Sequence, residues 1–279
     1  MTRIPLWMRL LRAYSLRTPF HRGTYRIALW CYQHLQVPST EVETTIDRTL
    51  QVSLRLPIWV DYNIYCLGVY EAPLARFFKQ SIRPDAVVID VGAYIGQYTL
   101  LAAKYAPHGH VVALEPHPIS FARLSSHVIR NRMSNVTLLQ KAAGRERGRL
   151  PLAPSSQFSD SRLLPTDSSD DTTEVEVIAL DELVEEQELG RVGLVKVDAE
   201  GAEGEVLKGA EQTLQKFLPT LVVELDRSRE KAWGADPESI LAMLAKWGYT
   251  FFVVEGWSLK PLSRTVDYAN VIAIPPKKD

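Results

Sequence analysis

The stretch of sequence that decides the fold reads Val87-Val88-Ile89-Asp90-Val91-Gly92-Ala93-Tyr94-Ile95-Gly96. Its first half is a short apolar run that predicts a strand buried on both faces of a parallel sheet. The two glycines permit a tight turn and let backbone N–H groups approach a ligand closely. In open parallel sheets, ligands bind beyond the carboxyl ends of the strands, where the strand order reverses. The stretch therefore predicts a nucleotide-like ligand beside Asp90, Gly92 and Gly96.

The chain after this stretch alternates β-branched runs with helix-length amphipathic segments. This alternation is typical of βαβ units and predicts an α/β fold with a mostly parallel, Rossmann-like sheet. Strands are expected at 87–91, 110–115, 136–140, 173–179, 192–197, 221–225, 250–255 and 269–274. Helices are expected at 68–81, 96–106, 118–131, 180–188, 203–217 and 237–247.

Length and composition indicate an ordinary globular protein. The 279 residues allow one large α/β domain, which we place at 70–279, and an N-terminal helical extension at 1–69. The formal charge of −1 gives no cationic footprint, so no nucleic-acid partner is expected. Cys31 and Cys66 lack metal-ligand spacing and fit a reduced compartment. No apolar run approaches the ~18–20 residues that span a bilayer. We therefore expect a cytoplasmic location.

The N-terminal forty residues are basic and contain no Asp or Glu before Glu41. Apolar residues between the arginines predict an amphipathic helix. One interpretation is a helix that packs on the domain or on a second subunit, as in a homodimer. The other is reversible adsorption to an anionic membrane surface. The arginines are Arg3, Arg9, Arg12, Arg17, Arg22 and Arg26.

The segment at 151–173 interrupts the α/β rhythm with clustered Ser, Asp and Pro residues. Such a composition predicts a long surface loop. Long loops inside compact domains are often lids or binding loops, and a merely variable excursion is the alternative. We expect the residues that select the substrate to lie in this loop and in the N-terminal extension.

The spacing of the glycines and the residue that ends the next strand narrow the class of ligand that the site can bind. The pattern is Asp-x-Gly-x-x-x-Gly, with Tyr94 where a dinucleotide fingerprint would have its middle glycine. An acid beside the turn would repel a pyrophosphate but suits the cationic S-adenosylmethionine. Glu115 ends the second strand, where a carboxylate can accept hydrogen bonds from ribose hydroxyls. A nicotinamide-dependent oxidoreductase stays as an alternative.

A third motif reads Lys196-Val197-Asp198-Ala199-Glu200-Gly201-Ala202-Glu203-Gly204-Glu205. Lys196 and Asp198 point the same way at the end of a strand. Lys196 needs a partner because an unpaired buried charge is costly, and Asp198, Glu200 or Glu224 could supply it. Glu203 and Glu205 suit the first turn of a helix, where the helix dipole favours acids.

Taken together, these blocks resemble the FkbM family of class I S-adenosylmethionine-dependent methyltransferases over about 70–225. The resemblance implies a class I sheet with one antiparallel strand near the C-terminus, S-adenosylmethionine as cofactor and methylation of a hydroxyl. Tyr94 stands where the family usually has Asn, beside the amino-acid end of the cofactor. The resembling blocks are 88–99, 114–118, 142–144 and 196–203, with the Tyr70-Glu71 helix before them.

The resemblance also implies roles for individual residues. Asp90, Gly92 and Gly96 would line the methionine part of the cofactor, and Glu115 the ribose. Lys141 and Ala142 would flank the adenine. Asp198 would lie near the methyl group, and Tyr70 and Glu71 would close the same pocket.

Oxygen methylation requires removal of the hydroxyl proton. Our hypothesis is that Asp198 or Glu200 is the base, with Lys196 setting its charge state. A divalent metal held by Asp198, Glu200 and Glu224 is an alternative way to activate the hydroxyl. The expected acceptor is a small molecule such as a sugar, a glycolipid or a polyketide-type natural product. A non-catalytic binding protein of the same fold is the remaining alternative.

Overall fold

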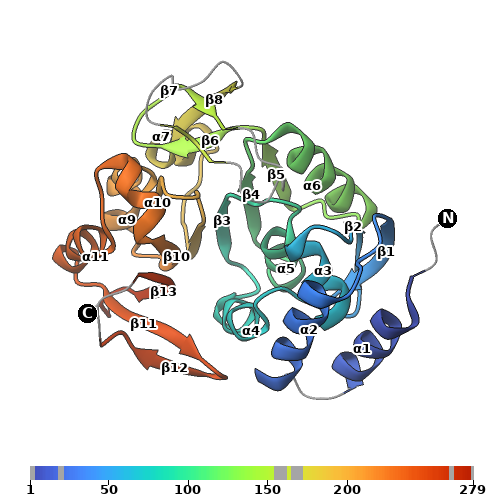
Figure 1. The fold of residues 1–279 in the computed structure, drawn as a ribbon. Coiled ribbons are helices and arrows are strands. Elements are labelled where there is room, and N and C mark those ends of the chain that lie inside the picture. The colour runs from blue at the N-terminus through green and yellow to red at the C-terminus, as the bar shows by residue number, and fades with distance from the viewer. Residues whose placement is uncertain (1–3, 18–21, 154–161, 165–171, 264–266, 278–279) are drawn as a thin grey trace.

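A computed structural model describes residues 4–17, 22–153, 162–164, 172–263 and 267–277. Its centre is an eight-stranded sheet of order β12-β11-β13-β10-β9-β3-β4-β5. Figure 1 shows this sheet running through the molecule, with helices on both faces. The strands are β3 (Val87–Val91), β4 (His110–Leu114), β5 (Val136–Leu139), β9 (Leu194–Val197), β10 (Thr220–Asp226), β11 (Thr250–Glu255), β12 (Ser258–Pro261) and β13 (Tyr268–Ile274).

The strand directions confirm the predicted class I arrangement. The five strands from β5 to β10 are mutually parallel. β13 lies antiparallel between β10 and β11, as expected for one reversed strand near the C-terminus. β12 adds a second reversed strand at the edge, which we did not predict. The chain runs outward from β3 to β5 and then returns to β9 on the other side of β3. The strand order therefore reverses between β3 and β9.

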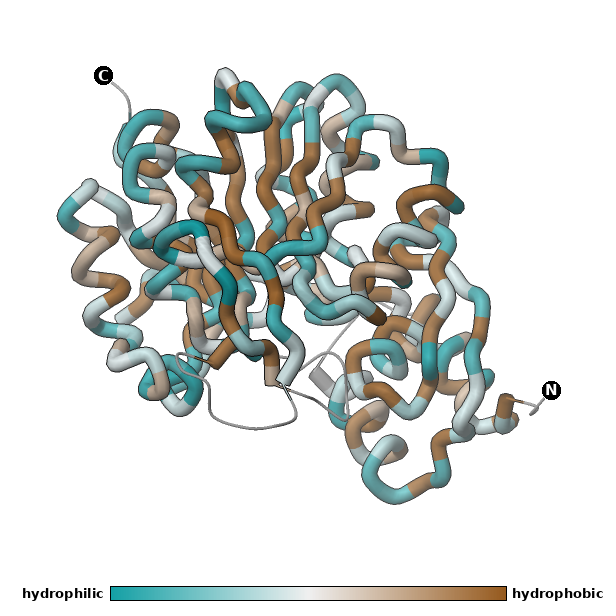
Figure 2. The backbone as a smooth tube through the Cα atoms, turned by 90° about the horizontal axis from the view of Figure 1, so that it is seen from above, coloured by the Kyte–Doolittle hydropathy of each residue, from teal (hydrophilic) through white to brown (hydrophobic). Residues whose placement is uncertain are grey.

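Successive side chains along the central strands belong to two different buried layers. Val88 and Val111 belong to one apolar cluster and Ile89 and Val112 to another. Successive strand residues point to opposite faces, so a strand apolar at every position is buried on both. Figure 2 shows these apolar strands side by side at the centre of the molecule. From residue 72 onward, the helices are α4 (Ala72–Ser81), α5 (Gln97–Tyr105), α6 (Pro118–Arg130), α7 (Leu180–Glu186), α8 (Glu203–Lys208), α9 (Glu211–Phe217), α10 (Arg227–Glu230) and α11 (Pro237–Lys246), and a 3-10 turn covers Lys231–Trp233.

Two predicted elements differ in detail. The helix expected at 203–217 is two helices, α8 and α9, because Gly209 packs directly on the backbone of Gly144, where a Cβ atom would overlap the carbonyl oxygen. The strand at 173–179 is confirmed as β8 (Thr173–Ala179), and it lies in a separate three-stranded sheet with β6 (Ala142–Gly144) and β7 (Gly148–Leu152). The predicted loop at 151–173 lies largely outside the described residues.

The N-terminal region contains helices, as predicted, and also a hairpin that we did not predict. Left-handed backbone at Asp47 and Arg48 turns the hairpin. The region packs on the rest of the protein, because Met8 and Leu54 belong to the same buried cluster as Leu100 of α5. No helix within the described ranges is long and apolar enough to cross a membrane. The elements are α1 (Leu6–Arg17), α2 (Arg22–His34), β1 (Glu41–Ile46), β2 (Leu50–Arg55) and α3 (Trp59–Leu67).

Candidate active site

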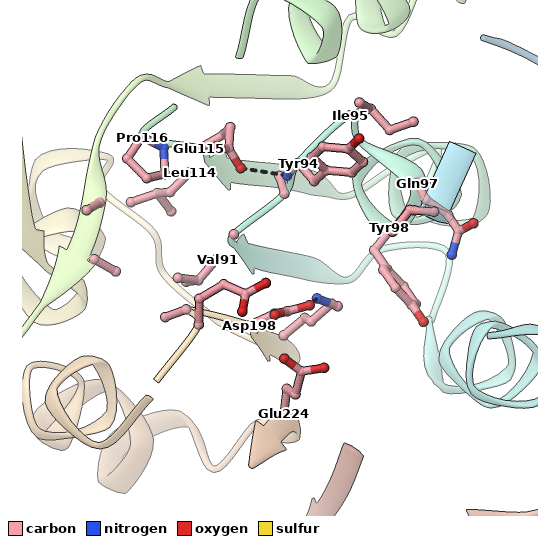
Figure 3. A pocket seen from close by; sticks show the side chains of 18 of the residues that line it. Val91, Tyr94, Ile95, Gln97, Tyr98, Leu114, Glu115, Pro116, Asp198 and Glu224 are labelled. Atoms are coloured by element: carbon pink, nitrogen blue, oxygen red, sulfur yellow. Dashed lines mark hydrogen bonds and ion pairs between the residues drawn. The ribbon is translucent and has the colours of Figure 1, made fainter. Parts of the chain in front are cut away.

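A cavity of about 300 Å³ lies at the carboxyl ends of β3 and β9, where the strand order reverses. Figure 3 shows side chains from β3, β4, β10 and α5, and Asp198 just after β9, converging on it. This is the position at which open α/β sheets bind ligands. The predicted site residues on its wall are Tyr70, Glu71, Gly92, Tyr94, Glu115, Lys141, Ala142, Lys196, Asp198 and Glu200.

The glycine turn brings the ends of two strands into direct contact. Gly92 has φ +73°, and a Cβ atom there would overlap the carbonyl oxygen of Asp198. The backbone N–H groups of Gly92 and Ala93 both donate to the carbonyl oxygen of Leu114, at 3.0 Å. The turn is therefore held by the ends of β4 and β9, which leaves its remaining face open to the cavity.

Glu115 is a buried carboxylate at the edge of the cavity. Its Oε2 accepts the backbone N–H of Tyr94 at 2.7 Å, drawn in Figure 3, and its Oε1 accepts that of His117 at 2.9 Å. Burial raises the pKa of Glu115 to about 7, although both backbone donors oppose the shift. Each carboxylate oxygen has two lone pairs. One lone pair on each oxygen therefore stays available for a ligand hydroxyl.

Two predicted cofactor residues do not line the cavity. Asp90 is fully buried behind the turn, where its Oδ2 accepts the hydroxyl of Thr99 at 2.6 Å. Its Oδ1 has no hydrogen-bond partner among the described residues. Burial raises the pKa of Asp90 despite the nearby Lys196. Gly96 begins α5 with φ +90°, and a Cβ atom there would lie 2.5 Å from Leu124. Both residues lie behind the wall of the cavity, and their predicted ligand contacts remain predictions.

The buried Lys196 has the charged partner that its sequence position required, the half-buried Asp198. Its Nζ donates to Oδ2 of Asp198 at 2.8 Å and lies 4.9 Å from the ring centroid of Tyr98. Burial alone would lower the pKa of Lys196, but the attraction of Asp198 and Asp90 outweighs it and raises the pKa. Lys196 therefore stays charged and holds the Asp198 carboxylate at the cavity.

Three carboxylates face one another beside this pair. Oxygen atoms of Asp198, Glu200 and Glu224 lie within 4.8 Å of one another, the set that we considered for a divalent metal. Arg229 pairs with Glu200 and lies 3.7 Å from Glu224. The cluster thus contains a protein cation of its own. Burial and Asp198 raise the pKa of Glu224 to about 9, although Tyr268 donates to it at 2.6 Å.

Glu71 also lines the cavity. Its carboxylate accepts hydrogen bonds from Tyr98 at 3.4 Å and from Asn270 at 2.9 Å. Burial and the charge of Asp198 raise its pKa to about 7. The neighbouring Tyr70 backbone is held in both directions by the amide of Gln97, at 2.7 and 3.0 Å. The segment just before α4 is therefore hydrogen-bonded to the first turn of α5.

The far wall comes from β6. Ala142 is buried, and it lines the cavity together with Lys141, which directly precedes β6; their place beside the adenine remains a prediction. Glu203, which we expected to have a structural role, accepts the backbone N–H groups of Ala199 and Gly201 at 2.7 and 3.0 Å. Burial raises the pKa of Glu203 to about 8. It shapes the loop that carries Glu200.

Several wall residues were not identified from the sequence. Trp59 and Val60 come from the N-terminal region, and Leu152 and Leu163 come from the 151–173 segment. Both regions were expected to contact the acceptor, although no motif singled out these positions. Arg229 was also missed, because a lone arginine after a strand carries no recognisable signal.

The donor set fits S-adenosylmethionine. Glu115 offers two carboxylate oxygens for a ribose diol, and the turn at Gly92 gives a close backbone approach. Asp198 supplies negative charge for a ligand that carries an ammonium and a sulfonium. The sheet order and this cavity define a class I S-adenosylmethionine-dependent methyltransferase.

The comparison with known families is specific. A family model described as "Methyltransferase FkbM domain" matches residues 90–251. The chain belongs to the FkbM methyltransferase family.

Three curated relatives show similar levels of identity. "Methyltransferase 1" of Beauveria bassiana is 31% identical over 52% of this chain and 66% of its own length. "Hexuronic acid methyltransferase AglP" of Haloferax volcanii is 30% identical over 63% of this chain and 68% of its own. "31-O-demethyl-FK506 methyltransferase FkbM" of Streptomyces tacrolimicus is 27% identical over 61% of this chain and 74% of its own. The chain thus spans two thirds to three quarters of these relatives.

Proposed function

We propose that this protein transfers a methyl group from S-adenosylmethionine to a hydroxyl oxygen of a small molecule. The observation that carries the proposal is the Lys196–Asp198 pair at the mouth of the glycine turn. A carboxylate held by a charged lysine is suited to accept a proton from a bound hydroxyl. The names of the relatives, which include a hexuronic acid methyltransferase and a 31-O-demethyl-FK506 methyltransferase, support an oxygen acceptor.

When bound, S-adenosylmethionine supplies an electrophilic methyl group, and its sulfur keeps the electron pair of the broken C–S bond. Asp198 accepts the hydroxyl proton as the acceptor oxygen forms its new bond to carbon. Lys196 orients the Asp198 carboxylate through the 2.8 Å hydrogen bond. Asp198 and Glu200 are each paired with a cation, Lys196 and Arg229. We assign the base to Asp198 because its backbone packs directly against Gly92 in the glycine turn. Positioning of the reacting groups supplies much of the acceleration in such displacements.

A comparison of two conservative variants tests this assignment. Asp198→Asn should retain affinity for S-adenosylhomocysteine within a few-fold and lose most turnover. Glu205→Gln is the matched control, because Glu205 follows on α8, pairs with Lys208 and does not line the cavity. The assay uses the full chain, methyl-labelled cofactor, and uronic acids and glycosides as acceptors, with detection by mass spectrometry.

Full turnover by Asp198→Asn would remove Asp198 from the catalytic role. Wild-type protein that binds S-adenosylhomocysteine but methylates no hydroxyl acceptor would favour the non-catalytic alternative.

We also propose that α1 and α2 contact an anionic membrane surface. Leu6 is 66% exposed and Trp30 is 54% exposed, and the side chains of Arg9, Arg17 and Arg26 are exposed on the same helices. Exposed apolar and aromatic residues among arginines are typical of helices that lie in a membrane interface. A two-fold dimer through this face would place the same cationic surface against itself. The charge therefore favours anionic lipid over a second copy.

Sedimentation with vesicles tests this contact. The full chain should bind phosphatidylserine-containing vesicles, bind phosphatidylcholine vesicles far less, and be released by salt. A Leu6→Glu/Leu10→Glu variant should lose binding. Ile129→Glu is the control, since Ile129 is 76% exposed but lies on α6. Equal binding by both variants, or a salt-resistant dimer in solution without vesicle binding, would contradict the proposal.

A further inference from the structure

Tyr94 holds an unfavourable backbone conformation at the edge of the cavity. It lies in the glycine turn with φ +50°. This left-handed region is uncommon for residues other than glycine, and asparagine and aspartate enter it more easily than bulky residues. The surrounding structure must therefore offset the cost of a tyrosine here. Asparagine is the residue that the family resemblance leads one to expect at this position.

The Tyr94 side chain points away from the turn into a buried polar network. Its hydroxyl donates to Oδ1 of Asp61 on α3 at 3.1 Å. Arg123 of α6 donates to the same hydroxyl at 3.3 Å, and its guanidinium carbon lies 5.7 Å from the Tyr94 ring centroid. Arg123 also pairs with Asp61. The Tyr94 hydroxyl thus joins the buried Asp61 to the oppositely charged, partly buried Arg123.

The same network includes the hairpin of the N-terminal region. Oδ2 of Asp61 accepts the backbone N–H of Arg55 at 2.6 Å, and Arg123 donates to the carbonyl oxygen of Ser53 at 3.1 Å. Asp61 is fully buried, so each of its hydrogen bonds replaces one to water. Without the Tyr94 hydroxyl, Oδ1 of Asp61 would lack this donor.

Both ends of this connection touch the cavity. At one end, the Tyr94 backbone N–H donates to Glu115, the residue expected to hold the ribose. At the other end, Trp59 and Val60 directly precede Asp61 on the first turn of α3, and both line the cavity. One side chain therefore connects the cofactor side of the cavity with the wall that the N-terminal region supplies.

We propose that Tyr94 is a positioning residue that couples cofactor binding to the placement of α3. Its hydroxyl, held by Asp61 and Arg123, keeps the turn in the conformation that orients Glu115. By thermodynamic linkage, cofactor binding must then stabilise α3 to the same extent. The proposal rests on cofactor binding in this cavity and is independent of the acceptor and of the base.

The test removes one hydroxyl and leaves the Asp61–Arg123 pair in place. Tyr94→Phe should weaken binding of S-adenosylhomocysteine by about three- to tenfold, because one hydrogen bond to a charged group is at stake. Tyr105→Phe is the matched control. The Tyr105 hydroxyl donates to Asp47 at 2.8 Å and also joins the hairpin to α5, but it does not line the cavity. Its affinity should equal that of the wild type.

Hydrogen exchange supplies the readout that a merely structural role would not change. In wild-type protein and in Tyr105→Phe, S-adenosylhomocysteine should slow amide exchange across 59–67. In Tyr94→Phe this protection should be lost, while protection of the β3 turn remains. The binding experiment needs no acceptor, so absent turnover would affect the proposed function and not this inference.

Two outcomes would overturn the proposal. One is Tyr94→Phe with wild-type affinity and full ligand protection of α3, whatever its melting temperature. The other is Tyr94→Asn with affinity equal to or above that of the wild type. Asparagine relieves the backbone cost but cannot reach Asp61 in the same way, so that result would mean that the tether has no role in binding.

Discussion

Replacing Gly92 by alanine should strongly destabilise the protein and its cofactor site. The new Cβ atom would lie 2.9 Å from the carbonyl carbon of Asp198 and closer still to the carbonyl oxygen. Neither neighbour is a flexible side chain that could move aside. The end of β3 would therefore have to separate from the end of β9, which carries Lys196 and Asp198 to the cavity.

The expected magnitude has two parts. A residue with a Cβ atom pays roughly 1–2 kcal/mol to occupy left-handed backbone such as the φ of +73° at Gly92. Forcing extra atoms into a packed site costs roughly another 1–3 kcal/mol. The free energy of unfolding should thus fall by roughly 2–5 kcal/mol. For a chain of this size that corresponds to about 5–15 °C in melting temperature.

Thermal unfolding with a matched control separates the two parts. Gly256 has φ +61°, and a Cβ atom there would meet nothing within 4 Å. Gly256→Ala should therefore show only the backbone cost, and Gly92→Ala should lose about 1–3 kcal/mol more. Calorimetric binding of S-adenosylhomocysteine should be greatly weakened by Gly92→Ala alone. Equal melting temperatures for the two variants, with intact binding, would refute the reasoning.

Three further predictions concern pH and metal. Burial raises the pKa of Glu115 to about 7, and its ionised form is the better hydrogen-bond acceptor. Affinity for S-adenosylhomocysteine, measured by calorimetry, should therefore fall several-fold between pH 8 and pH 6. Glu115→Gln should bind more weakly and lose this pH dependence. Burial raises the pKa of Glu203 to about 8. The stability that Glu203 contributes is therefore fully present below its unfolded pKa of about 4.5 and is lost as pH rises through 8. Glu203→Gln should accordingly melt closer to, or above, the wild type at pH 9 than at pH 6, and a constant difference would contradict this. Because Arg229 pairs with Glu200, EDTA should leave methyl transfer unchanged, and a metal-restorable loss of activity would show that a cation replaces Arg229.

The central sheet could be predicted from local pattern because its strands are buried on both faces. Continuous apolar runs such as 87–91 have few alternatives to a central parallel strand. The sequence also predicted that residues at the strand ends would lie together, because the carboxyl ends of parallel strands meet at one edge of the sheet. Tyr70 and Glu71 were assigned to the same cavity only because of the family resemblance. The hairpin at 41–55 was missed because β1 alternates charged and β-branched residues on a largely exposed edge.

The tertiary structure decided features that depend on contacts distant in sequence. Gly209 interrupts a helical pattern because Gly144 packs against it, and no local signal marks that contact. Asp90 and Gly96 lie in the predicted motif, yet both support the turn from behind and do not line the cavity. Arg229 neutralises a carboxylate cluster that looked, as a set of residues, suited to a metal.

The sequence by itself determined the α/β class, the position of the glycine turn and the carboxylates that surround it. These follow from periodicity and from the geometry of parallel strands, which act over a few residues. Only the tertiary structure decided where side chains point and which charges meet. Tyr94 is the clearest case, because its direction is set by Asp61 and Arg123, which lie 33 and 29 residues away in the chain. Hydrogen bonds between such distant residues depend on the packed fold, and no local pattern encodes them.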